Sequence, residues 1–185
     1  MNADIECDPI TYGLDADDVI VYVDEHWEPF ARSNGAPELT AGRVVGKTLA
    51  SFIADARVRH LYDLLYAQVR RQQTPISFPL RCDGPHVRRK LEIRVEPEAE
   101  GHLRVCSRTL QVELRDSICL PSGRPETTDS YTTICSWCKK VHVEDQWCEV
   151  EEAVIRLQLL SETPELTHGL CPACADDLTR RIDDA

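Results

Sequence analysis

Four of the nine cysteines form two C-x-x-C pairs in the last third of the chain, Cys135-Ser136-Trp137-Cys138 and Cys171-Pro172-Ala173-Cys174. Two thiolate pairs, each on a tight turn, can present four sulfurs in a tetrahedron around one zinc ion. A site of this kind has no open coordination position, so it stabilises a fold and does not activate water. We therefore expect the metal ligands to be Cys135, Cys138, Cys171 and Cys174, holding one structural Zn²⁺ per chain.

The same thiols allow a second chemistry, because oxidation can eject zinc and join Cys135 to Cys138 and Cys171 to Cys174. A thioredoxin-like dithiol is disfavoured, since no βαβ pattern surrounds either pair. His168 stands three residues before Cys171 and is an alternative ligand, although a hydrogen bond to a ligated sulfur or a turn role is the favoured reading. The other five cysteines stand singly, and we expect Cys82 and Cys106 to be small packed residues.

Additional structure must fill the interval between the pairs, because 32 residues separate them and simple zinc ribbons use about 15 to 20. Residues 141–147 alternate like one arm of a hairpin, and residues 149–160 have helical spacing. Pro172 suits the first position of another helix, which places Cys171 at its cap. The free N–H groups at such a helix start favour thiolates. We expect Trp137 and Trp147 to build the small core of this module.

The region before the cysteine module combines helical and strand patterns. Residues 19–23 suit a buried strand, and residues 57–73 predict a long helix whose apolar residues share one face. After Pro75 the period changes to two, which predicts three antiparallel strands with one buried face and one face rich in Arg and Glu. The predicted fold class is α+β.

These patterns divide the chain into four parts. Residues 1–17 form an acidic N-terminal tail and residues 18–115 a first domain. Residues 116–132 are a linker rich in Pro, Ser and Thr, with too few apolar residues to order themselves. Residues 133–185 are the cysteine-rich module, for which we expect zinc binding.

Four stretches carry a resemblance to a known family: Ile20-Val21-Tyr22-Val23-Asp24, Trp27-Glu28-Pro29-Phe30-Ala31, Val45-Gly46-Lys47-Thr48 and Phe78-Pro79-Leu80-Arg81-Cys82-Asp83. With the order of elements, they resemble a bacterial PAS (Per-Arnt-Sim) sensor domain over roughly residues 18 to 115. The resemblance implies a five-stranded sheet cupped by helices, often with a small-molecule pocket, and a sensory or dimerisation role. It does not identify a PAS ligand.

The cysteine module resembles treble-clef zinc fingers in outline, because a cysteine knuckle, a hairpin and a helix start follow one another. Its strings Cys135-Ser136-Trp137-Cys138-Lys139-Lys140 and Thr167-His168-Gly169-Leu170-Cys171-Pro172-Ala173-Cys174 also resemble a cysteine-rich module of bacterial sensor and response-regulator proteins. This second resemblance covers about residues 133 to 178. It implies signalling without naming what the module binds.

Composition limits the remaining classes of function. The chain has 185 residues, with 21 basic and 32 acidic side chains, and a formal net charge of -11. Residues 135–185 hold 5 basic and 11 acidic residues, a net charge of -6, which makes nucleic acid an unfavourable partner. We expect the cluster Arg88-Arg89-Lys90 to be the solvated face of a strand. No apolar run reaches the length of a membrane span, and no secretory signal opens the chain, so we expect a cytoplasmic protein.

Catalysis and haem binding are not expected. No nucleophile with a base and an orienting group, no glycine-rich phosphate loop and no open metal site can be assembled from these residues. His60 points about 160° away from the packed face of its helix, so it is not an expected haem ligand.

The sequence therefore predicts a non-enzymatic, cytoplasmic bacterial signalling module. In this reading a PAS-like domain senses a ligand or pairs as a homodimer, and a structural zinc module contacts a partner protein. Two alternatives remain open: a thiol redox sensor that uses the two C-x-x-C pairs, and a transcriptional regulator whose zinc module touches DNA.

Overall fold

The computed structural model describes residues 9–84, 87–114, 131–157 and 165–184. Within them the chain is a mixed α+β protein with five α-helices, α1 (Trp27–Ser33), α2 (Ala41–Val44), α3 (Ala56–Gln72), α4 (Val150–Arg156) and α5 (Pro172–Asp183). The strands are β1 (Ile10–Leu14), β2 (Ile20–Val23), β3 (Ile76–Arg81), β4 (Val87–Pro97), β5 (Leu103–Leu114), β6 (Tyr131–Cys135), β7 (Val141–Val143), β8 (Gln146–Cys148) and β9 (Glu165–Gly169). Two short 3₁₀ turns cover Leu49–Phe52 and Ala99–Gly101.

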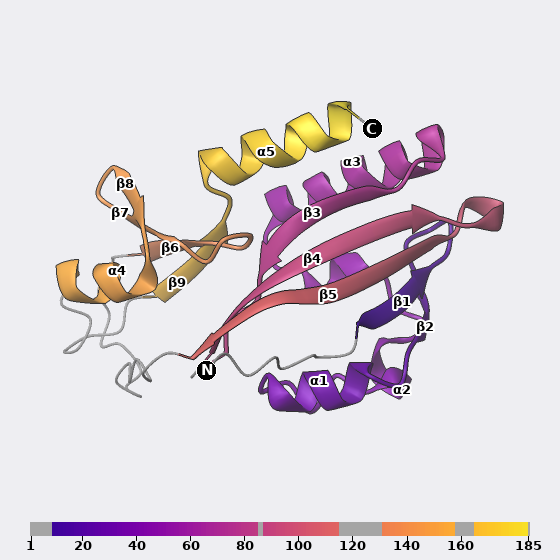
Figure 1. The fold of residues 1–185 in the computed structure, drawn as a ribbon, viewed down its shortest axis with the longest axis horizontal. Coiled ribbons are helices and arrows are strands. Elements are labelled where there is room, and N and C mark those ends of the chain that lie inside the picture. Colours follow the sequence, from indigo (N-terminus) through magenta and orange to yellow (C-terminus); the bar gives the residue numbers. More distant parts are fainter. Residues whose placement is uncertain (1–8, 85–86, 115–130, 158–164, 185) are drawn as a thin grey trace.

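Five strands form one antiparallel sheet in the order β2-β1-β5-β4-β3 (Figure 1). The meander β3-β4-β5 confirms the three strands that the alternation after Pro75 predicts. α3 confirms the predicted long helix. It begins after Asp55, whose carboxylate accepts hydrogen bonds from two backbone N–H groups of the first turn, and it ends at Gln73 in a left-handed conformation.

Strand β1 corrects the predicted N-terminal tail, because it lies inside residues 1–17. It pairs with both β2 and β5 and so occupies an interior position in the sheet. Gly13 leaves room for the ring of Tyr22, since a Cβ at this position would lie 2.2 Å from that ring and would displace it. The strand is only five residues long and acidic residues flank it. Its local pattern is therefore weak, and pairing with β5, some 90 residues later, defines it.

The two faces of this sheet have opposite character, as the alternation predicts. One face packs against α3 in a core whose fully buried members include Leu65, Val69, Phe78 and Val95. The other face carries ion pairs between neighbouring strands, among them Arg104–Glu96 at 2.6 Å and Arg108–Glu92 at 2.9 Å. The helices therefore cover one side of the sheet, and the charged side faces solvent.

The cysteine module contains a second sheet, in the order β8-β7-β6-β9. A hairpin is present as predicted, but residues 141–147 are not one arm of it, because β7 and β8 place both arms within residues 141–148. α4 confirms a helix after the hairpin over Val150–Arg156. Residues 158–160 of the predicted helix and residues 116–130 of the predicted linker lie outside the described residues. Residues 131–132, which were predicted to end the linker, belong to β6 instead. β9 was not predicted, and it pairs in parallel with β6 along all five of its residues.

The two units share one hydrophobic core. The ring centroid of Trp137 lies 5.0 Å from that of Phe78 on β3 and 5.5 Å from that of Tyr62 on α3. The prediction that Trp137 fills the module's own small core is therefore wrong. The ring centroid of Trp147 lies 5.0 Å from that of His142 within the module, but Trp147 also packs against the shared core. Trp137 is 5% exposed because the neighbouring unit covers it.

The module is seated on the outer edge of β3 (Figure 1). The backbone N–H of Arg81 donates to the carbonyl of Trp137 at 2.9 Å, and the Arg181 guanidinium donates to the carbonyl of Ser77 at 2.9 Å. Pro79 lies between these two positions, and it has no N–H that would need a partner. The module thus provides partners for one N–H and one carbonyl on the outer edge of β3.

We predict that Trp137→Ala lowers the free energy of unfolding by about 3–5 kcal/mol, because it opens a cavity in the shared core. Trp147→Ala is the matched control, and it should cost less because that side chain is only half-buried. Denaturant unfolding followed by circular dichroism, in excess zinc, measures both variants. Equal losses would contradict the placement of Trp137 in the shared core.

Candidate metal centre

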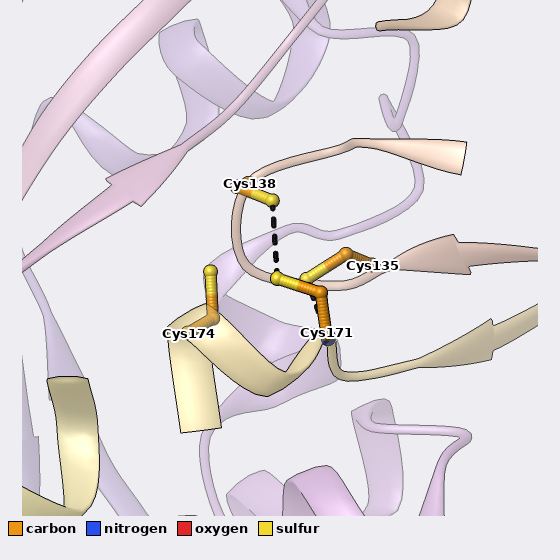
Figure 2. A group of neighbouring side chains, drawn as sticks. All are labelled: Cys135, Cys138, Cys171 and Cys174. Atoms are coloured by element: carbon orange, nitrogen blue, oxygen red, sulfur yellow. Dashed lines mark hydrogen bonds between the residues drawn. The ribbon is translucent and has the colours of Figure 1, made fainter. Parts of the chain in front are cut away.

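The four cysteines of the two C-x-x-C pairs meet at one point of the structure (Figure 2). Their sulfur atoms all lie within 4.8 Å of one another, and the Sγ atoms of Cys138 and Cys171 are 3.7 Å apart. Four sulfurs bonded to zinc at about 2.3 Å define a tetrahedron with edges of about 3.8 Å. A disulfide would need about 2.05 Å, so these thiols are unbonded and spaced as metal ligands are.

The first pair lies in a tight turn that leaves β6. The backbone N–H of Lys139 donates to the carbonyl of Cys135 at 3.0 Å, and the N–H of Cys135 donates to the carbonyl of Lys140 at 2.7 Å. Lys139 has a φ of 59°, a left-handed conformation that only a few non-glycine residues adopt. This turn brings Cys138 back over Cys135, so that both sulfurs point to the same side.

The second pair lies at the start of α5, as the sequence predicts. Cys171 is the N-cap residue, and Pro172 and Cys174 both lie in the first turn of the helix. The free N–H of Cys171 donates to the sulfur of Cys135 at 3.4 Å. A helix start favours negative charge through its unpaired N–H groups and its dipole, so it suits a thiolate.

Gly169 explains part of the motif before the second pair. The N–H of Ser136 donates to the carbonyl of Gly169 at 2.8 Å, which ties the first turn to β9. A Cβ at Gly169 would lie 2.9 Å from the side chains of both Thr133 and Arg57. The close approach of these chains therefore requires glycine.

The two histidines considered as ligands lie elsewhere. His168 is exposed on β9, opposite Ile134 of β6, and it does not belong to the sulfur cluster. His60 is exposed on α3, in agreement with its predicted direction. Among the described residues, the group that could hold a metal ion consists of the four cysteines.

Hydrogen bonds among the thiols distribute the protons unevenly. The Cys138 thiol, and then the backbone N–H groups of Cys138, Cys171 and Trp137, lower the pKa of Cys135 to about 4, against the effect of burial. The same bond to Cys135, with burial, raises the pKa of Cys138 above its usual range. Burial also raises the pKa of Cys174 to about 12. A divalent cation resolves this competition, because it replaces the thiol protons.

Arginines from the first sheet reach the cluster's surroundings, which corrects the expectation that Arg88 and Arg89 form a solvated face. Arg88 lies 3.4 Å from Glu149 and 2.9 Å from Glu151 of the module, whereas Arg89 bonds to Asn34. Lys90 is exposed, as expected. Charge pairing across the two units therefore uses part of this basic cluster.

Arg81 is the residue near the site that the sequence analysis missed. Its side chain is only 9% exposed, and its guanidinium binds Asp83 at 2.7 Å and Glu149 at 2.5 Å. Burial acts to lower the pKa of Arg81, but these carboxylates raise it above its usual value. Its position at the end of a strand was visible in the sequence, although its partners in the module were not.

A shallow groove of about 260 Å³ lies between helices of the two units. Leu61, Leu64 and Ala67 line it from α3, and Thr179 and Ile182 line it from α5. It contains no residue of the sheet, so it differs from the pocket between sheet and helices that a PAS resemblance implies.

In the described part of the chain, no helix is both long enough and apolar enough to cross a bilayer.

Comparison with solved structures found distant neighbours of this chain. No family model and no curated protein matches the chain. A solved structure described as a domain of an HTR-like protein from Haloarcula marismortui matches with a TM-score of 0.41 and 15% identity. The match covers 56% of this chain and 98% of that domain. A likeness at this level does not by itself define a shared fold or function.

We predict that Cys171→Ser loses the bound metal, because serine removes one of four sulfur donors and leaves an incomplete tetrahedron. His168→Ala should keep one metal per chain, since that side chain lies outside the cluster. Elemental analysis of protein purified in reductant measures both. Metal loss in the His168 variant would show that the histidine is needed for the site.

Proposed function

We propose that this chain is a cytoplasmic bacterial signalling module with no catalytic activity of its own. A PAS-like unit senses a ligand or pairs as a homodimer, and a structural zinc module contacts a partner protein. The observation that carries the proposal is the convergence of four sulfurs at tetrahedral spacing in a module seated on the edge of the sheet.

Zinc fits the donor set better than other common metals. Thiolates are soft ligands, and a four-sulfur tetrahedron is typical of zinc or of iron–sulfur proteins. The order of a cysteine knuckle, a hairpin and a helix start agrees with the treble-clef outline and with zinc. All four positions of the tetrahedron are taken by protein, so bound zinc would supply stability and no reactive water.

The sensory part of the proposal rests on the first sheet and its helices. A five-stranded antiparallel sheet with helices on one face is the architecture that the PAS resemblance implies. The shared core supports coupling, because Trp137 of the module packs between Phe78 of the sheet and Tyr62 of α3. A ligand or a second subunit that shifts α3 or β3 would then alter the module's seating.

A thiol redox sensor is the second candidate. The sulfurs of Cys138 and Cys171 are 3.7 Å apart although they belong to different C-x-x-C pairs. One hydrogen peroxide molecule can oxidise these two thiols to a disulfide and is itself reduced to two water molecules. The bound metal is then released. This contact allows a disulfide between the pairs in addition to the disulfides within them that the sequence suggested, since the Cys135 and Cys138 thiols are also in hydrogen-bond contact. Peptide mapping after mild peroxide treatment distinguishes the two pairings.

We predict one zinc per chain and four thiols that react with a thiol reagent only after chelation. Chelation should also lower the melting temperature of the whole chain, because the metal site shares its core with the sheet. Metal content, thiol titration and calorimetry in reductant measure these effects. Absence of metal, with the four thiols freely reactive, would overturn the zinc proposal and favour redox switching.

The partner role needs a separate test. We expect a partner captured by the wild-type chain to be lost with Cys171→Ser and retained with His168→Ala, which leaves the sulfur cluster intact. Affinity capture with both variants, followed by binding measurements on the purified partner, tests this. Equal binding by all three proteins would remove the module as the contact surface.

A further inference from the structure

We propose that Arg81, a residue of the first sheet, is a positioning residue of the metal centre in the cysteine module. The inference rests on the zinc site of the proposed function. It adds that the site is completed across the boundary between the two units. One residue of β3 holds the turn that carries two of the four ligands.

Arg81 contacts the first cysteine turn in two places. Its backbone N–H donates to the carbonyl of Trp137 at 2.9 Å, and its guanidinium Nη1 donates to the carbonyl of Cys138 at 3.1 Å. The two acceptors are successive carbonyls of the C-S-W-C turn. A single residue of the sheet therefore fixes the orientation of two neighbouring peptide groups, one of which follows a metal ligand directly.

The peptide after Cys138 is the one where orientation matters most. It leads into Lys139, whose φ of 59° is unfavourable for a residue with a side chain and persists only where the surroundings hold it. The Lys139 N–H of this same peptide donates to the carbonyl of Cys135 at 3.0 Å. Arg81 thus holds the oxygen of this peptide while Cys135 holds its N–H, and the turn is fixed from both ends.

Arg81 is itself rigidly held. Its Nε atom lies 2.9 Å from both carboxylate oxygens of Asp83, and Nη1 also bonds to Glu149 at 2.5 Å. A planar guanidinium can serve these acceptors at once, whereas a lysine ammonium is a single point charge with no fork. The side chain is therefore suited to position a neighbouring group precisely where a flexible cation would not.

Coupling between metal and sheet follows from this arrangement. If Arg81 favours the turn geometry that binds metal, then bound metal must equally favour the seating of the turn on β3. The affinity of the site for metal then depends on how the turn packs on the edge of β3, and this packing depends in turn on whether metal is bound.

The first test measures zinc release from the full chain to a chromogenic chelator. Arg81→Gln should release zinc about 10-fold faster or more, which is the usual size of effect when an outer partner of a metal site is removed. The release rate of Arg81→Lys should lie between those of Arg81→Gln and wild type. Arg88→Gln is the matched control, because Arg88 pairs with Glu149 and Glu151 across the same boundary without touching the turn. It should stay within about twofold of wild type.

Hydrogen exchange distinguishes this coupling from a general loss of stability, which would speed exchange throughout the chain. Chelation of the wild-type protein should speed exchange in the segment 76–82, where the Arg81 N–H is bonded to the turn, and leave the β1–β5 pairing protected. Release at the wild-type rate from both Arg81 variants would overturn the inference, as would equally fast release from Arg88→Gln. Should Arg81→Gln not fold, Arg81→Lys carries the test. A wild-type chain without zinc would instead overturn the proposed function.

Discussion

The packing of Trp137 against Phe78 and Tyr62 is the contact on which the arrangement of the molecule depends. The tryptophan stands between two cysteine ligands, yet its ring is buried by the other unit. Because protein interiors are close-packed, the ring position fixes the turn that carries Cys135 and Cys138. The geometry of the metal centre is therefore tied to the core of the sheet through one side chain.

The size of the module explains why this contact is needed. A unit of about 50 residues has little core of its own and usually needs a metal, a disulfide or a neighbour to fold. Among the residues that the structure describes, its separate hydrophobic cluster has four buried members, Val141, Val143, Cys148 and Ala153. Cys135, Cys171 and Leu178, in contrast, are buried in the core shared with the sheet. The sheet thus supplies stabilisation that the module lacks, and a metal ion bound by the four cysteines would add to it.

The first sheet also depends on the module. The outer edge of β3 would otherwise present unpaired backbone groups, which promote pairing with other chains. Trp137 and Arg181 bond to that edge, and Pro79 removes one donor from it. Ion pairs of Arg81 and Arg88 with Glu149 and Glu151 add contacts between the units. A structural change in either unit would be transmitted to the other, because the boundary between the units is close-packed and close-packed interiors transmit strain.

The local features of this protein can be predicted from its sequence. Periodicity, turn residues and cap chemistry act within a few residues of the chain. They predict the two cysteine pairs, a hairpin, the helix start at Pro172, the long helix and the three-stranded meander. The strands β1 and β9, the burial of Trp137 in the neighbouring unit and the partners of Arg81 are set by the tertiary structure. Each of these depends on partners tens of residues away, and no local pattern encodes which distant strand or carboxylate a residue will meet.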